Sequence, residues 1–144
     1  MSTTDAPSTR TTGADGVRWD LTDLYPTEDE LHTALTATEA DAAAFGEQFR
    51  GRIADLDASR LGTALESLGD LHDRAGRAYT YAYLAWSTAT EDPARGALLQ
   101  SVREAYTRIG QSVLFFDVEW ARLDPERARA LLDDPALAPY RHTL

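Results

Sequence analysis

Apolar residues recur every three or four positions between residues 61 and 123, and this rhythm is broken once, at Thr90-Glu91-Asp92-Pro93. Spacings of three and four place side chains on one face of an α-helix, so each half of the stretch predicts a long helix. Asp92 can accept the free N–H groups of a first helical turn, and proline at the first helical position loses no hydrogen bond. The stretch therefore predicts two antiparallel helices joined by a short turn.

The first helix of this hairpin is expected to start near 57–59, with Asp57 or Ser59 as its N-cap, and to run to about Thr88; the second runs from Asp92 to about Leu123. The predicted seam on the first helix is Leu61, Leu65, Leu68, His72, Ala75, Tyr79, Ala82 and Trp86. On the second helix it is Leu98, Val102, Ala105, Ile109, Val113, Phe116, Trp120 and Leu123. If the turn centres near Thr90-Glu91, the numbers of facing residues sum to about 181. The expected pairs are Leu61 with Trp120, Leu65 with Phe116, Leu68 with Val113, Ala75 with Tyr106, and Tyr79 with Val102.

Three glycines, Gly62, Gly69 and Gly76, lie seven residues apart along the first hairpin helix. Each glycine lowers the stability of a helix by about 1 kcal/mol relative to alanine, so three of them at regular spacing indicate a structural role. We expect a neighbouring helix to approach closely there, with local flexibility as the alternative.

Cap signals define the other helices. Thr27-Glu28-Asp29-Glu30 has the spacing of a capping box and opens a helix expected from about Glu28 to Phe49, ended by Gly51. Asp124-Pro125 predicts a short helix to about Leu132, and Asp134-Pro135 predicts one more turn. No stretch favours a strand. The predicted fold is all-α and bundle-like: a long antiparallel hairpin, a further N-terminal helix and short C-terminal helices.

The chain divides into a polar tail, 1–16, and a helical domain, 17–144. The tail is rich in Ser, Thr, Asp and Gly, and is expected to be disordered because it offers too little apolar surface to offset its ordering entropy. The N-terminal helix is too short to cover the whole hairpin, which leaves apolar surface for another partner. The last residues, Pro135 to Leu144, resemble the approach to a further helix without a cap, so we expect the domain to be the truncated N-terminal piece of a larger protein.

Charge and composition exclude several classes of function. The formal net charge is −10, and no basic stripe is present, which argues against nucleic acid as a partner. There is no cysteine, so disulfides and thiolate metal sites are excluded. No stretch reaches the ~18 apolar residues of a membrane span, and the N-terminus lacks the pattern of a secretory signal. A cytoplasmic location is therefore expected.

The histidines His32, His72 and His142 are dispersed, and none belongs to a His-Glu-x-x-His motif, in which two imidazoles one turn apart hold zinc. His72 falls on the predicted seam, where a hydrogen-bonded interior or boundary histidine is the expected reading. His32 is expected on a solvated helix face.

Paired carboxylates occur at Glu28/Asp29, Glu91/Asp92 and Asp133/Asp134, all at helix boundaries, where capping and the helix dipole account for them. We therefore predict no catalytic, cofactor-binding or metal-binding residue in this chain. Tyr81 and Tyr83 lie off the seam, and are the aromatic residues expected to meet a neighbouring domain or a substrate channel.

Several segments, in order, resemble one family. Trp19-Asp20-Leu21-Thr22-Asp23-Leu24-Tyr25-Pro26 is similar to the opening of oligoendopeptidase F proteins. The segments Asp92 to Gln100, Leu114 to Glu119 and Leu137 to His142 also fit that family, and the resemblance covers about Arg18 to Leu144.

This resemblance implies a parent protein that is a zinc metalloendopeptidase of the thimet-like superfamily, cleaving oligopeptides in an enclosed helical channel. The zinc-binding His-Glu-x-x-His helix of such enzymes lies far downstream, and no position here matches it. The chain would then be part of the channel wall, with the catalytic remainder of the peptidase as its partner and no activity of its own. The alternative is a stand-alone helical module that serves interaction or dimerisation.

Overall fold

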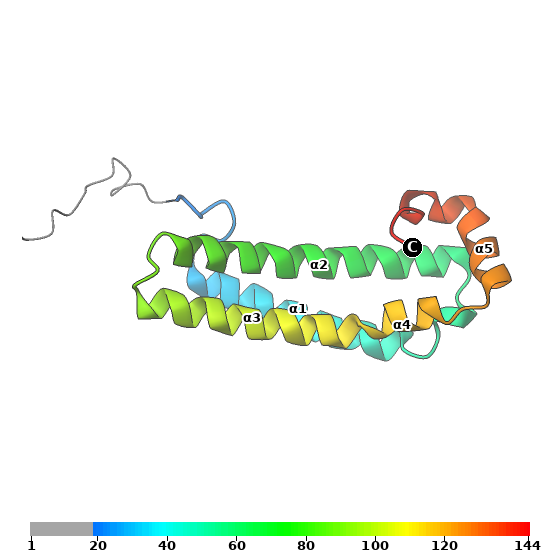
Figure 1. Cartoon of the computed structure of the whole chain (residues 1–144), viewed down its shortest axis with the longest axis horizontal. Coiled ribbons are helices and arrows are strands. Elements are labelled where there is room, and N and C mark those ends of the chain that lie inside the picture. The colour runs from blue at the N-terminus through cyan, green and yellow to red at the C-terminus, as the bar shows by residue number, and fades with distance from the viewer. Residues whose placement is uncertain (1–18) are drawn as a thin grey trace, which may run out of the picture.

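The computed structural model describes residues 19–144, and in this part of the chain every regular element is a helix. The elements are α1 (Glu28–Phe49), η1 (Ile53–Asp55), α2 (Ala58–Ser87), α3 (Pro93–Val113), α4 (Phe115–Ala121), α5 (Pro125–Asp133) and η2 (Pro135–Tyr140). The predicted all-α class and bundle-like arrangement are confirmed: α1, α2 and α3 lie side by side, and the short C-terminal elements fold over one end (Figure 1). The tail predicted to be disordered, 1–16, lies outside the described residues. Among those described, no helix is long and apolar enough to cross a membrane.

Local signals set the start of the first two long helices. Thr27 Oγ1 accepts a hydrogen bond from the N–H of Glu30 at 3.2 Å, which is the expected half of a capping box. No return bond from the Glu30 carboxylate is found among the described residues. Asp57, and not Ser59, caps α2, because its carboxylate accepts the N–H of Arg60 at 2.8 Å.

The three Asp-Pro pairs all start helices as predicted. In each, the aspartate Oδ1 accepts the backbone N–H of the second residue after it: Asp92 from Ala94 at 2.9 Å, Asp124 from Glu126 at 3.0 Å, and Asp134 from Ala136 at 2.9 Å. The proline occupies the first helical position, where a missing N–H costs nothing.

The chain direction of α1 follows from its ion pairs with α3. Glu28 pairs with Arg95 at 2.7 Å, and Glu39 pairs with Arg108 at 2.6 Å, so residue numbers rise together and the two helices are parallel. With 22 residues against 21, α1 covers one side of α3 along its whole length. α1 is nevertheless shorter than α2, with 22 residues against 30, so it does not cover the whole hairpin, as predicted. It also leaves the opposite side of the α2–α3 pair uncovered (Figure 1).

The buried face of α2 is rotated from the predicted seam. Leu61, Leu65, Ala75 and Ala82 are buried as expected, but Leu68, Tyr79 and Trp86 are only half-buried, and His72 is exposed. Buried in their place are Ala64, Leu71, Ala78, Tyr81 and Ala85. The difference arises from tertiary packing. Because α2 packs against both α1 and α3, its buried residues lie on the face between these two helices.

The hairpin register agrees with the prediction to within one helical turn. The rings of Tyr79 and Tyr106 lie 5.7 Å apart between centroids. The sum of these two residue numbers is four greater than the 181 used to predict Val102 as the partner of Tyr79. Four residues correspond to about one helical turn.

The second hairpin helix does not run unbroken to Leu123 as predicted. It stops at Val113 and resumes as α4 at Phe115. At this point the guanidinium of Arg50 donates a hydrogen bond to the carbonyl of Ser112 at 3.2 Å and lies over the Phe115 ring at 4.6 Å. A side chain that takes a carbonyl of the helical ladder is a known cause of such interruptions.

The connection between α1 and α2 is fastened by a side chain from α4. The Glu119 carboxylate accepts the N–H of Gly51 at 2.7 Å and the N–H of Ile53 at 3.4 Å. Gly51 has a φ of +76°, the left-handed conformation that favours glycine after a helix end. Gly51 therefore ends α1 as predicted, and the loop that follows is tied to a residue 68 positions later.

The glycine stripe does not mark a close helix–helix approach. A Cβ at Gly62 would lie 3.7 Å from the carbonyl oxygen of Ala136 and from Leu137, both in η2, which is ordinary contact. At Gly69 and Gly76 a Cβ would meet nothing within 4 Å. The close-approach interpretation is wrong for these two positions, which face open space among the described residues.

Candidate functional site

The histidines lie apart in the structure, as they do in the sequence. His72 is exposed, and its Nδ1 lies 2.9 Å from the carbonyl oxygen of Leu68, so the predicted hydrogen bond exists but on the surface and not in the interior. His32 and His142 are also exposed. Within residues 19–144 there is no group of three or more His, Cys, Asp or Glu side chains arranged to hold a metal ion.

The paired carboxylates have the local roles expected of helix boundaries. Asp92 and Asp134 are N-caps, and Glu28 forms an ion pair with Arg95. The other member of each pair is exposed. The absence of catalytic, cofactor-binding and metal-binding residues from this chain stays a prediction.

The open side of the hairpin carries a connected group of aromatic rings, which we call the aromatic cluster: Tyr79, Tyr83, Trp86 and Tyr106. Tyr79 is stacked with Tyr83 at 6.4 Å and meets Tyr106 of α3 at 5.7 Å, and Tyr83 lies 6.2 Å from Trp86. Tyr83 and Tyr106 are 45% and 43% exposed. Exposed aromatic rings that touch one another are enriched at binding surfaces.

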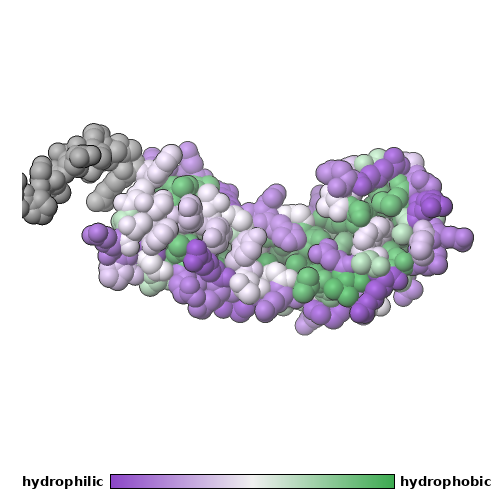
Figure 2. Space-filling view, in the orientation of Figure 1, coloured by the Kyte–Doolittle hydropathy of each residue, from purple (hydrophilic) through white to green (hydrophobic). Residues whose placement is uncertain are grey.

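Apolar residues gather on the same side of the molecule, toward the C-terminal elements. Figure 2 views the molecule from the side on which α1 lies behind α2 and α3, and hydrophobic residues are visible over the half near α4 and η2. Two of the most exposed large apolar residues, Leu114 and Val118, belong to the α3–α4 region, at 57% and 41% exposed. Exposed apolar surface of this kind is typical of an interface.

Tyr81 is not part of this surface, contrary to the prediction. It is buried and packs edge-on against Tyr25, with 5.8 Å between ring centroids. Two positions along a helix correspond to a rotation of roughly 200°, so Tyr81 and Tyr83 point to opposite sides of α2. Only Tyr83 remains as the exposed aromatic residue that the sequence predicted.

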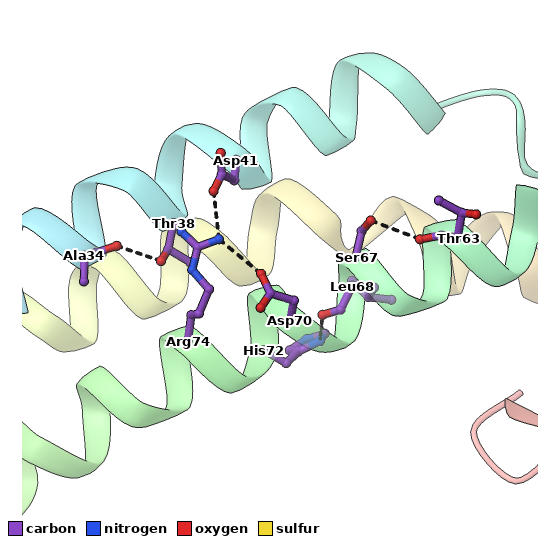
Figure 3. A network of polar contacts seen from close by, with 9 residues as sticks. All are labelled: Ala34, Thr38, Asp41, Thr63, Ser67, Leu68, Asp70, His72 and Arg74. Carbon is purple, nitrogen blue, oxygen red and sulfur yellow. Dashed lines mark hydrogen bonds and ion pairs between the residues drawn. The ribbon is translucent and has the colours of Figure 1, made fainter. Parts of the chain in front are cut away.

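The side of α2 that faces α1 carries a polar network (Figure 3). Arg74 pairs with Asp41 of α1 at 2.7 Å and with Asp70 of its own helix at 3.2 Å. The hydrogen bond to Asp41 is the main reason that the pKa of Arg74 is raised. Beneath it, Thr38 is buried and donates its hydroxyl to the carbonyl of Ala34 at 2.7 Å. These groups satisfy one another, which is typical of a structural network.

A cavity of about 320 Å³ lies at the turn end of the bundle, between the segment that precedes α1 and the end of α2. Its lining includes Trp19, Asp20, Tyr25, Tyr81, Asp92 and Arg95. No motif or periodicity in the sequence predicts this cavity. The apolar residues Leu21, Leu24 and Tyr25 before the Thr27 cap indicate that this segment packs against the helices, but they do not indicate which helix it contacts.

Comparisons with models of known protein families, with curated proteins and with solved structures give no match for this chain.

Proposed function

We propose that this chain is the N-terminal, channel-wall region of an oligoendopeptidase F-like zinc metallopeptidase that hydrolyses short peptides. The observation that carries the proposal is the ordered series of segments resembling that family, from Trp19–Pro26 through 92–100 and 114–119 to 137–142. Zinc and the His-Glu-x-x-His helix would be supplied by another part of the peptidase, since no residue here matches them.

The uncovered side of the α2–α3 pair supports this proposal. A channel wall needs one face packed within its own domain and another turned toward the rest of the enzyme. Here α1 occupies the first face, and the aromatic cluster occupies the second. Burying exposed aromatic and apolar side chains against a catalytic region would contribute a favourable ~25 cal/mol per Å² of apolar surface.

The direct test is complementation. The 144-residue protein is mixed with the catalytic region of an oligoendopeptidase F-like enzyme from which the N-terminal helices have been deleted. We expect a 1:1 complex by size-exclusion chromatography with light scattering, and a gain in cleavage of a quenched fluorescent oligopeptide. Absence of both the complex and the gain would remove the basis for the proposal.

A matched pair of variants locates the contact. Tyr106→Arg, in the aromatic cluster, should abolish the complex because it would bury an unpaired charge. The control is Thr107→Arg. Thr107 is the next residue of α3 and is also exposed, and among the described residues its hydroxyl donates only to the carbonyl of Arg103 in the same helix. This variant should leave the complex intact. Equal loss in both variants would point to a general effect of added charge.

The second candidate function is a stand-alone helical module that dimerises, favoured by the same exposed face. Sedimentation equilibrium of the isolated protein separates the two: a concentration-dependent dimer that Tyr106→Arg dissociates supports the module. The peptidase proposal expects the isolated chain neither to bind zinc stoichiometrically nor to cleave the peptide. Chelator-sensitive cleavage by pure material would contradict it.

A further inference from the structure

Three aromatic residues are among those that line the cavity at the turn end of the bundle. Tyr25 and Tyr81 form its inner side and are 9% and 7% exposed, while Trp19, 64% exposed, stands at its edge. The rings of Tyr25 and Tyr81 meet at an interplanar angle of 84°. The two rings therefore pack edge to face against each other, and the guanidinium of Arg77 already lies over the Tyr25 ring, 5.2 Å from its centroid. The exposed indole of Trp19 remains as the ring whose face a ligand could contact.

The hydroxyl groups of the two buried tyrosines are potential hydrogen-bonding groups of the cavity. No hydrogen bond to either hydroxyl is found within residues 19–144, and this part of the chain contains no side-chain N or O atom that is both fully buried and unpartnered. The hydroxyls of Tyr25 and Tyr81 must therefore reach solvent, and the cavity is the open space that both residues line. Both are free to accept a hydrogen bond from a bound donor.

The charged residues of the lining are two carboxylates, Asp20 and Asp92, and one guanidinium, Arg95; Arg77, next to the lining, donates to the carbonyl of Asp23 at 2.8 Å. Asp20 Oδ1 accepts both hydrogen bonds from Thr22, at 2.6 and 3.1 Å, and these bonds lower the pKa of Asp20, so that its carboxylate is ionised at neutral pH. Within residues 19–144 no hydrogen bond to its Oδ2 is found. Asp92 likewise uses Oδ1 for its cap. The one positive group in the lining as described, Arg95, is already paired with Glu28 at 2.7 Å.

We propose that this cavity binds a small organic cation, a primary ammonium or guanidinium group on a short carbon chain. The carboxylates of Asp20 and Asp92 supply the charge, the tyrosine hydroxyls accept hydrogen bonds, and Trp19 covers the carbon chain. An anion is repelled by the two aspartates, and a neutral ligand gains only the apolar contact. The proposal stands on the cavity alone and does not depend on the peptidase assignment.

The test is a titration of the full chain with three probes of equal length: n-butylammonium chloride, n-butanol and sodium butyrate, at constant ionic strength. Binding is measured by tryptophan fluorescence and by amide shifts of residues 19–25 in ¹⁵N spectra. We expect saturable changes with the ammonium only. Trp19→Phe should remove the fluorescence response and keep the amide shifts, which separates Trp19 from the other two tryptophans.

Charge variants complete the test. Asp20→Asn keeps the Oδ1 acceptor for Thr22 but removes the charge, and should weaken n-butylammonium binding about fivefold. Asp23→Asn, in the same segment but outside the cavity lining, should change it by less than about twofold. Equal affinity for n-butanol, an equal effect of both variants, or no saturable change with any probe would overturn the proposal.

Discussion

The two sides of the α2–α3 hairpin are held by different interactions. On the covered side, ion pairs from α1 reach both hairpin helices: Asp41 to Arg74 of α2, and Glu28 and Glu39 to α3. On the open side, among the described residues, no ion pair joins α2 to α3, and the helices meet there through the rings of Tyr79 and Tyr106. Exposed apolar and aromatic groups are typical of interaction surfaces, whereas polar groups on a packed surface find their partners within the fold. The two sides of the hairpin therefore differ in how their exposed side chains are satisfied.

The largest effect should come from the core of the covered side. Phe45 of α1 is buried and contacts the rings of Phe49, Phe115 and Phe116. We expect Phe45→Ala to lower the free energy of unfolding by about 3–5 kcal/mol, because it leaves a cavity among these rings. Urea denaturation followed by circular dichroism measures this change. A loss below about 1 kcal/mol would show that α1 is not part of the folded core.

A smaller effect is expected for the ion pairs on the same side. Arg74→Ala removes the pairs with Asp41 and Asp70, whose side chains are about 60% exposed. Exposed pairs contribute little, so the expected loss is roughly 0.5 kcal/mol and should shrink as salt is raised, because salt screens exposed charges. Denaturation at low and high sodium chloride gives the comparison. A loss that did not depend on salt would assign the effect to the packing of the arginine stem.

On the open side, substitution should hardly change stability. Tyr83→Ser removes an exposed ring of the aromatic cluster, and the expected change in the free energy of unfolding is within about 0.5 kcal/mol. Tyr81→Ser, on the opposite side of α2, removes a buried ring and should lower the free energy of unfolding several times more. If the two variants had equal effects on thermal unfolding, the distinction between the sides would be wrong.

The smallest effect concerns pH. The folded state lowers the pKa of Asp20 below its ordinary value of 3.8 through the hydrogen bonds from Thr22. A carboxyl whose pKa is lowered on folding stabilises the folded state above pH 3.8, and this contribution is lost as the pH falls through the lower, folded-state pKa. Thr22→Val should therefore raise the pKa of Asp20 toward 3.8, as measured by carboxyl ¹³C chemical shifts. No movement would mean that the side-chain bond to Thr22 is absent in solution.

The features predicted well from the sequence are those fixed by neighbours along the chain. Asp92, Asp124 and Asp134 start helices because their carboxylates meet N–H groups two residues away, and no other part of the fold is needed. The hairpin follows from one short turn between two long helices. These local rules give the element order and the fold class.

The features predicted poorly depend on a third element. The buried face of α2 differs from the predicted one because α1 covers one side of this helix. Tyr81 is therefore buried in the core, and His72 is exposed at the surface. The interruption at Leu114 coincides with a contact from Arg50, 62 residues before the carbonyl that it reaches. The cavity between residues 19–26 and the α2–α3 turn is lined by separate segments of the chain, and no repeat of residue types along the sequence predicts it. Each requires knowledge of where a distant segment lies.

The link from Glu119 to the α1–α2 connection has a consequence for hydrogen exchange. The amide protons of Gly51 and Ile53 lie in a short surface connection, where exchange is ordinarily fast. Since both are held by the carboxylate of Glu119, they should exchange when that carboxylate releases the loop. Their exchange rates thus report the opening of this contact between α4 and the loop, and comparison with amides in the middle of α2 would show whether this end of the bundle loosens before the whole domain unfolds.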